Sequence, residues 1–189
     1  MPLPRRFTVE EYLVVERKAE AKSEFHQGQI FAMAGGLPDH SLIASNMGIE
    51  LGVRLKGQPC RVYNSDLKLA VAGGESVYYA DVSVVCGELK LFGRHRDVAA
   101  NPKLVVEVLS KSTGRYVRLV KLPLYQRTPT MTDILLVSQD RVRLEHLARN
   151  DEKAKWKSAV YSKLTDVVEL PSLNCALPLA DVYSKVKLP

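Results

Sequence analysis

Two valine-rich segments constrain the fold more than any other feature of this sequence. Residues 77–86 (VYYADVSVVC) and 104–110 (LVVEVLS) are nearly continuous in hydrophobicity, which is typical of strands buried on both faces of a sheet. Each segment contains a single acid, Asp81 in the first and Glu107 in the second. An ionised carboxylate in such surroundings is unfavourable by several kcal/mol unless it is paired or bound to a metal.

Strand geometry predicts where these two acids point. Side chains alternate across a strand, so Asp81 shares a face with Tyr79, and Glu107 shares one with Val105 and Leu109. If the two strands are neighbours with these faces aligned, the carboxylates converge on one point. Their oxygens suit a hard cation such as Mg²⁺ or Mn²⁺, which could activate water beside a phosphate. The alternative is that each acid forms a structural salt bridge.

The remaining segments predict an α/β sandwich with a mixed central sheet, an N-terminal helix and a hairpin. Helices are expected at about residues 9–19, 40–56, 113–126 and 178–183. Strands are expected at about residues 23–26, 29–33, 60–71, 77–86, 104–110, 133–138, 142–147 and 156–161. A basic, polar connection is expected between the strands at 77–86 and 104–110, and no internal repeat or domain linker interrupts the chain.

Local signals mark several of these boundaries. Thr8 and Glu11 match the capping box of a first helix, and Gln27-Gly28 is a hairpin turn. Asp39 is a suitable cap for the second helix. Pro123 should kink or restart the third.

Length and composition predict one soluble domain spanning residues 1–189. The net charge of +6 and pI of about 9.2 permit a polyanionic partner without requiring one. No stretch approaches the ~20 apolar residues of a membrane span, and residues 1–6 lack the pattern of a signal peptide. A cytoplasmic location is therefore expected. Cys60, Cys86 and Cys175 are dispersed, which favours buried, reduced thiols over a disulfide framework.

Other catalytic chemistries find no support in the sequence. There is no GxSxG nucleophile elbow and no glycine-rich phosphate loop. The four histidines show no metal-ligand spacing.

The chain resembles a bacterial family described as Uma-type putative restriction endonucleases, a branch of the PD-(D/E)XK nucleases. The resemblance covers nearly the whole sequence. Its motifs are Phe7–Leu13, Glu24–Gly36, Pro38–His40, Ser65–Lys68, Ala80-Asp81, Glu107–Thr113, Lys121, Tyr125, Leu136–Gln139 and Leu170–Leu173.

This resemblance implies a restriction endonuclease-like fold and a nuclease that uses Mg²⁺ or Mn²⁺. It implies Asp81 and Glu107 as metal ligands, with the carbonyl of Val108 as a third. Superfamily members place a lysine two residues after the glutamate, where this chain has Leu109. The catalytic lysine is then Lys121 on the following helix.

Each of the other candidate site residues has two possible roles. Lys111 is a second candidate for the catalytic lysine if the strand extends far enough to place it on the face of Glu107. Glu24 matches a position characteristic of the branch and either supplies a further carboxylate near the metal or pairs with a cation. His40 is either a capping or packing group or a proton shuttle. Asp66 and Lys68 share one face of their strand and either line the cleft or take part in cross-strand ion pairs.

Two departures from the family pattern affect the expected site. Ala80 replaces the usual proline before the aspartate. Val117 occupies a position, four residues before Lys121, that often carries an acid, and residues four apart share a helix face. The loss of this acid could leave Lys121 unpaired or weaken the site.

Three functions follow as alternatives. The first is metal-dependent hydrolysis of DNA, with Arg115 and Arg118 among the phosphate contacts. The second is a nuclease-like scaffold that has lost catalysis and binds nucleic acid or protein. The third is a structural or oligomerisation domain. A homodimer is compatible with all three.

Overall fold

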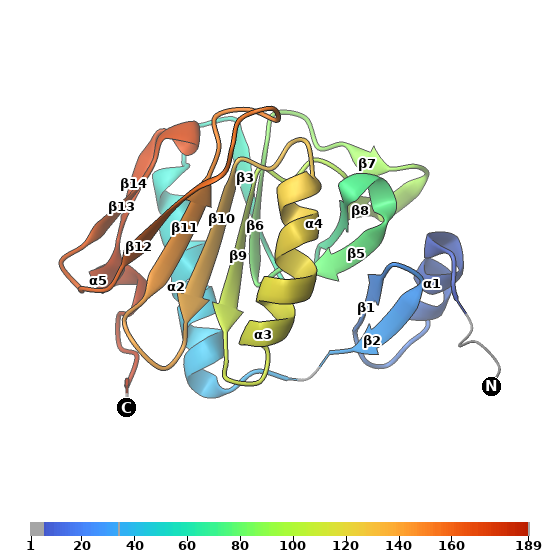
Figure 1. Ribbon diagram of the computed structural model, residues 1–189, viewed down its shortest axis with the longest axis horizontal. Coiled ribbons are helices and arrows are strands. Elements are labelled where there is room, and N and C mark those ends of the chain that lie inside the picture. The colour runs from blue at the N-terminus through green and yellow to red at the C-terminus, as the bar shows by residue number, and fades with distance from the viewer. Residues whose placement is uncertain (1–5, 34, 189) are drawn as a thin grey trace.

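The computed structural model describes residues 6–33 and 35–188 and builds them around two six-stranded sheets (Figure 1). Most of the N-terminal segment examined for a signal peptide therefore lies outside the described residues. The first sheet contains β1 (Ser23–His26), β2 (Gln29–Ala32), β4 (Lys68–Val71), β5 (Ser76–Tyr79), β7 (Leu91–Phe92) and β8 (His95–Ala99). The second contains β3 (Cys60–Asn64), β6 (Val82–Cys86), β9 (Leu104–Leu109), β10 (Asp133–Ser138), β11 (Leu144–Ala148) and β12 (Lys157–Tyr161).

Helices and short turns complete the described chain. The helices are α1 (Val9–Glu16), α2 (Pro38–Arg54), α3 (Gly114–Tyr116), the π-helical turn η2 (Val117–Lys121), α4 (Leu122–Arg127) and α5 (Leu179–Val182). Two 3-10 turns are η1 (Ala72–Gly74) and η3 (Pro171–Leu173), and a small hairpin joins β13 (Val167–Leu170) to β14 (Cys175–Pro178). None of the described helices is long and apolar enough to cross a membrane.

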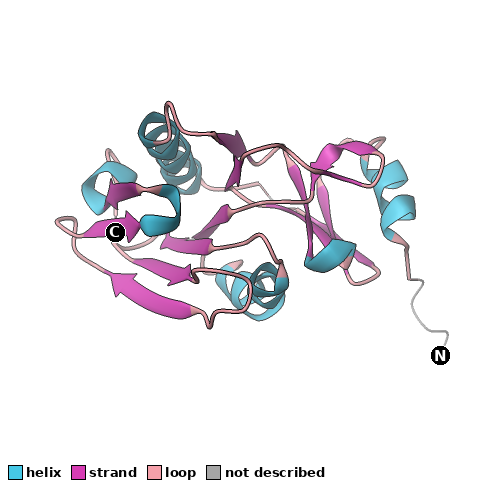
Figure 2. Ribbon diagram, turned by 90° about the horizontal axis from the view of Figure 1, so that it is seen from above, coloured by secondary structure: helices cyan, strands magenta, loops and turns pink. Residues whose placement is uncertain are grey.

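The second sheet is the mixed, helix-flanked sheet expected from the sequence. Its strand order is β12-β11-β10-β9-β6-β3, with β9 parallel to β10 and the other neighbours antiparallel. Figures 1 and 2 show α2 on one face and the helical segment from α3 to α4 on the other. The predicted fold class is confirmed, although the chain builds a second large sheet, ordered β2-β1-β5-β4-β8-β7, beside the central one.

Strand β9 shows how the central sheet is buried on both sides. Leu104, Val106 and Val108 pack into the core that includes α2. Val105 and Leu109 pack on the opposite face, in the core that includes η2 and α4. Because side chains alternate along a strand, Glu107 lies on the same face as Val105 and Leu109. The carboxylate therefore points toward η2 and α4.

The segments 60–71 and 77–86 were predicted as single strands, and this is wrong. Each breaks near its middle and passes from one sheet to the other: β3 and β6 pair in the central sheet, and β4 and β5 pair in the other. The β3–β6 pairing ends with Asn64 opposite Val82, and the β4–β5 pairing begins with Lys68 opposite Tyr79. At the bend, residues 65–67 of the first segment therefore lie opposite residues 80 and 81 of the second. One extra residue on one side of a strand pair is the feature of a β-bulge. Asp81 lies on the side that has two residues.

The helix expected at 113–126 forms at residues 114–127, with a π-helical turn in its middle. Pro123 has no backbone N–H and cannot continue the regular hydrogen-bond pattern. The N–H of Leu122 instead reaches the carbonyl of Val117, five residues back. Lys121 is the last residue of this π-helical turn.

Most of the other boundary predictions hold. The capping box of Thr8 and Glu11 is present, and the hairpin turns at Gln27-Gly28. The second helix instead begins at Pro38, with Leu37 as its cap, so Asp39 lies inside it. Proline suits this position because a first-turn N–H would have no helical partner.

The prediction of reduced thiols is wrong for two of the three cysteines. Cys60 and Cys86 are directly opposite in the β3–β6 pair and form a disulfide across 26 residues of sequence. Their proximity depends on strand pairing, which dispersed spacing does not reveal. Cys175 is free and partly buried.

Candidate active site

Asp81 and Glu107 lie opposite one another where β6 meets β9. The ladder pairs Val82 with Val106, so the next position outward places Asp81 across from Glu107. The backbone N–H of Val108 donates to Oδ2 of Asp81 at 2.7 Å. The two acidic segments are therefore neighbours, as the alternation argument required. Asp81, however, lies at the bend between β5 and β6 and its side chain is partly exposed.

Glu107 is almost fully buried, with 4% of its surface exposed. Its Oε1 accepts a hydrogen bond from the Tyr125 hydroxyl and lies 2.7 Å from Nζ of Lys121. Burial raises the pKa of Glu107 to about 7; the Lys121 charge opposes this shift and the Asp81 charge adds to it. Within residues 6–33 and 35–188, Oε2 of Glu107 has no hydrogen-bond partner.

Lys121 holds two buried carboxylates together. Its Nζ lies 2.8 Å from Oε1 of Glu24 and 2.7 Å from Oε1 of Glu107, and it donates to the carbonyl of Tyr79 at 3.2 Å. Burial alone would lower the pKa of Lys121, but the charges of Glu107 and Glu24 outweigh it and place the pKa above its usual range. The sequence allowed that Val117 could leave Lys121 unpaired. That expectation is wrong, because Glu24 supplies the second acid.

Glu24 reaches the site from β1, at the other end of the chain from Lys121. Its Oε1 accepts from the backbone N–H of Tyr79 at 3.1 Å, and its Oε2 accepts from the Tyr116 hydroxyl at 3.4 Å. The residue is 4% exposed. Of its two predicted readings, the structure shows the ion pair with a cation.

His40 lies in the first turn of α2, and its Nε2 is 3.0 Å from Oδ1 of Asp81. This hydrogen bond raises the pKa of His40 above its ordinary value, although burial opposes the shift. Both oxygens of Asp81 are thus held, one by His40 and the other by the Val108 N–H.

A cavity of about 440 Å³ joins these groups. It lies between the two sheets, at the C-terminal end of β9. Its lining residues are Glu24, Phe31, Ala32, Met33, Gly35, Gly36, Leu37, His40, Tyr79, Asp81, Glu107, Val108, Ser110, Ser112, Thr113, Tyr116, Val117, Lys121 and Gln139. The structure therefore brings together six residues expected from the sequence: Asp81, Glu107, Val108, Lys121, Glu24 and His40.

Four predicted site residues are not among those that line this cavity. Lys111 is exposed and follows the end of β9 at Leu109, so the strand does not extend far enough to place it beside Glu107. Arg115 is exposed on α3. Arg118 pairs with Glu145 at 2.7 Å. Lys68 forms a cross-strand ion pair with Asp97 of β8 at 3.0 Å, which is one of its two predicted roles.

The donor set can be tested for its fit to a divalent cation. Among the residues that the structure describes, no three histidine, cysteine, aspartate or glutamate side chains gather into a metal site. Asp81 and Glu107 supply two carboxylates, and Oε2 of Glu107 is available. Mg²⁺ commonly binds one or two carboxylates and keeps several waters. Two acids beside an open cavity fit such an ion.

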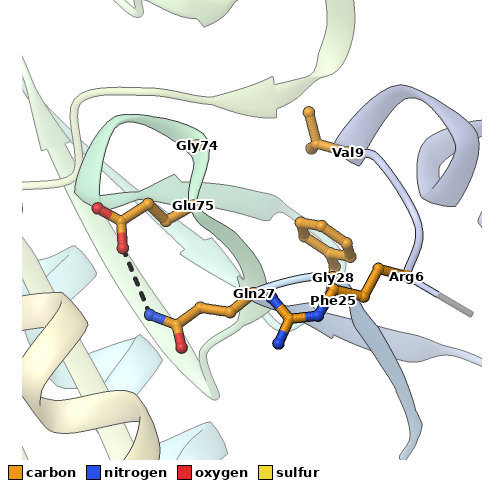
Figure 3. A pocket seen from close by; sticks show the side chains of 7 residues that line it. All are labelled: Arg6, Val9, Phe25, Gln27, Gly28, Gly74 and Glu75. Atoms are coloured by element: carbon orange, nitrogen blue, oxygen red, sulfur yellow. Dashed lines mark hydrogen bonds between the residues drawn. The ribbon is translucent and has the colours of Figure 1, made fainter. Parts of the chain in front are cut away.

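A second hollow, of about 530 Å³, lies beside the β1–β2 turn (Figure 3). Arg6, Phe25 and Gly28 contribute to its walls, and a 3.4 Å hydrogen bond joins Gln27 to Glu75. Its carboxylate, Glu75, is already paired with Arg127 outside the hollow. Glu75 is the single acid among the described residues that line it, so this hollow lacks the arrangement found at Asp81 and Glu107.

Sequence reasoning did not assign roles to Tyr116, Tyr125 or Gln139. Tyr125 follows Lys121 by four residues and therefore shares its helix face, a spacing that could have identified it as a partner of Glu107. Tyr116 meets Glu24 across 92 residues of sequence, which no local pattern indicates. Gln139 follows β10 directly and lines the cavity.

Comparisons with known proteins agree with this architecture. The sequence model of the Uma2 family, described as "Putative restriction endonuclease", matches residues 9–180. Two uncharacterized proteins of Synechocystis sp. (strain ATCC 27184 / PCC 6803 / Kazusa) are similar. The first, slr1290, is 35% identical over 182 residues, covering 96% of this chain and 93% of the relative. The second, sll1609, is 34% identical over 149 residues, covering 79% and 84%.

One solved structure shows the same fold. It is the crystal structure of a protein described as a "putative nuclease belonging to DUF820" from Anabaena variabilis ATCC 29413. The TM-score is 0.73 at 19% sequence identity, and the match covers 96% of this chain and 99% of the other. At this identity the likeness concerns the fold alone.

Proposed function

Because the chain belongs to the Uma2 family of "Putative restriction endonuclease" proteins, we propose that it hydrolyses phosphodiester bonds of DNA with the help of Mg²⁺ or Mn²⁺. One observation carries this proposal. Asp81 and Glu107 face each other at the β6–β9 junction, in one cavity with Lys121. A pair of acids with a nearby buried amine is an arrangement that can bind a cation and act on a phosphate.

The residues have separate roles in this proposal. Asp81, Glu107 and the carbonyl of Val108 would hold the ion, which supplies a Lewis acid and an activated water when bound. His40 and the Val108 N–H fix the orientation of Asp81. Glu24 holds Lys121 next to Glu107. From that position the amine can stabilise negative charge that develops on a phosphate.

The charge of the chain supports a polyanionic substrate. The net charge is +6, which favours association with nucleic acid. Lys111 and Arg115 are exposed in the segment whose Ser110, Ser112 and Thr113 line the cavity. We assign Lys111 and Arg115 to backbone phosphate contacts beside the site. A single domain, a cytoplasmic location and a homodimer remain predictions from the sequence.

The test is cleavage of plasmid DNA and oligonucleotides by the purified protein with Mg²⁺, with Mn²⁺ and with EDTA. Cleavage should require the metal and fall more than ~100-fold in Glu107→Gln and Asp81→Asn, since loss of an outer-shell partner alone costs about 10- to 100-fold. Glu145→Gln is the matched control, because Glu145 pairs with Arg118 and does not line the cavity. Calorimetry should detect Mn²⁺ binding that Glu107→Gln weakens.

A folded Glu107→Gln variant that cuts DNA at the wild-type rate would refute the proposal. The competing function is a binding scaffold without catalysis, and one observation favours it. Glu107 and Asp81 are each already matched, to Lys121 and to His40. In that case DNA binding would need no metal, would survive Glu107→Gln, and calorimetry would show no Mn²⁺ site.

A further inference from the structure

Beyond the one phosphate that Lys121 and a bound ion would meet, the cavity offers little to the neighbouring phosphates of a nucleic-acid chain. Of the described residues that line it, those that can carry a positive charge are Lys121 and His40. Lys121 is held by Glu24 and Glu107, and His40 by Asp81. The rest of the wall is largely apolar. The apolar and aromatic lining residues are Phe31, Ala32, Met33, Leu37, Tyr79, Val108, Tyr116 and Val117.

Phe31 presents an exposed aromatic ring on this wall. Its exposed fraction is 38%, which is high for a phenylalanine that lines a cavity. The ring lies 5.9 Å from that of Tyr116 at 47° and 6.3 Å from that of His26 at 62°. Neither neighbour lies parallel to the Phe31 ring, so these contacts orient the ring and do not occupy a face by parallel stacking. The ring can therefore stack against a planar ligand.

Gln139 supplies the second feature. Its Oε1 is buried and has no hydrogen-bond partner among the described residues. Its backbone N–H donates to the carbonyl of Leu109 at 3.1 Å, which fixes the residue at the end of β9 beside the cavity. A buried, unpaired amide oxygen is unfavourable for the folded protein. Because Gln139 also lines the cavity, its amide is placed to meet a ligand there.

We propose that the cavity binds a single unstacked nucleobase, with Phe31 stacking on the base and the Gln139 amide hydrogen-bonding its edge. The inference rests on the proposed function and specifies its substrate class. The preferred substrate is single-stranded or locally unpaired nucleic acid, in which a base can leave the helical stack. Base pockets of this kind combine aromatic or apolar stacking with a few polar contacts. A paired base in an intact duplex cannot enter such a pocket.

The test measures binding of oligonucleotides that carry 2-aminopurine, a base whose fluorescence changes when it stacks. The protein is the full-length Glu107→Gln variant, which is used so that the DNA is not cleaved when Mg²⁺ is present. The protein should bind the single strand at least about tenfold more tightly than the matched duplex, and it should quench the 2-aminopurine fluorescence of the single strand. Adding Phe31→Ala should weaken single-strand binding about 5- to 150-fold, which corresponds to the loss of one base stack. Phe31→Trp should retain binding, and Phe31→Leu checks that the ring rather than bulk is needed.

Gln139→Met tests the amide separately. It should weaken single-strand binding about tenfold without lowering the melting temperature, because the oxygen that it removes has no partner in the described part of the chain. A purely structural glutamine would instead lose thermal stability and keep its affinity. Leu119→Ala is the control, because Leu119 is exposed on η2, the helical turn that carries Lys121, and does not line the cavity.

The outcomes separate this inference from the proposed function. Equal or tighter binding of the duplex, or unchanged quenching in folded Phe31→Ala protein, overturns the base pocket even if metal-dependent cleavage is observed. Loss of quenching in Phe31→Ala and Gln139→Met supports the pocket even if the wild-type protein cuts no DNA.

Discussion

Glu107 and Asp133 are buried acids on neighbouring parallel strands, yet their surroundings differ. Oδ1 of Asp133 lies 2.8 Å from His146, and its Oδ2 accepts from the hydroxyls of Thr132 and Ser172. Both of its oxygens are therefore occupied. Glu107 uses Oε1 for Lys121 and Tyr125, and its carboxylate lines the cavity.

The comparison shows that burial of an acid does not by itself mark a functional site. Asp133 is 1% exposed and Glu107 is 4% exposed, so burial does not separate them. Hydrogen bonds satisfy the buried charge of Asp133, as a structural residue requires. Glu107 keeps an oxygen that has no partner among the described residues, and burial raises its pKa to about 7. An incompletely satisfied carboxylate on a cavity wall is the better indicator of function.

The largest expected effect on the free energy of unfolding comes from replacing the side chains that pair with these two acids. Lys121→Met would leave the buried Glu24 and Glu107 without their shared counter-charge. We expect the free energy of unfolding in EDTA to fall by about 3–5 kcal/mol, measured by urea denaturation. His146→Gln should cost less, about 1–2 kcal/mol, because an amide can still donate to Asp133. A smaller loss in Lys121→Met than in His146→Gln would contradict the comparison.

Neutralising each acid sharpens the contrast. Asp133→Asn should destabilise the protein by about 2 kcal/mol, because it weakens hydrogen bonds to a charged acceptor. Glu107→Gln should change stability by less than about 1 kcal/mol in EDTA, because it removes a charge that burial disfavours while Lys121 keeps Glu24. Thermal and urea unfolding of both variants provide the measurement. Equal destabilisation by the two substitutions would show that Glu107 is as structural as Asp133.

The sequence predicted the elements whose signals are local. The Thr8–Glu11 capping box, the Gln27-Gly28 turn and strand β10 follow from nearby residues, and the structure contains each of them. Asp81 and Glu107 stood out because each interrupts an apolar run, and strand pairing does place them opposite one another.

Features that depend on tertiary pairing could not be read in the same way. Tyr79-Ala80-Asp81 is as apolar as its flanks apart from the acid, so nothing local marks the passage from one sheet to the other. β7 and β8 lie in a segment that is basic and polar, because they lie toward one edge of their sheet. The Cys60–Cys86 disulfide requires the β3–β6 register.

The active-site network has the same origin. Glu24 meets Lys121 across 97 residues, which explains why Val117 suggested an unpaired lysine. The family resemblance identified both residues, but it could not indicate that they pair with each other. The unpaired oxygen of Gln139 likewise depends on which groups surround it in the folded chain.

Among the effects on metal binding, the smallest is expected at the hydroxyl that holds Glu107. Tyr125→Phe removes the donor to Oε1 and leaves the ring in place, so the carboxylate loses one of the two contacts that orient it. Because groups that orient a metal ligand contribute about 10- to 100-fold to affinity, we expect Mn²⁺ binding to weaken about tenfold by calorimetry. Tyr183→Phe is the control, since this buried tyrosine donates to the Ser138 carbonyl in the α2 core. If the two substitutions weaken Mn²⁺ binding equally, the effect reflects a general loss of packing. Glu107 would then not differ from Asp133 as a metal ligand.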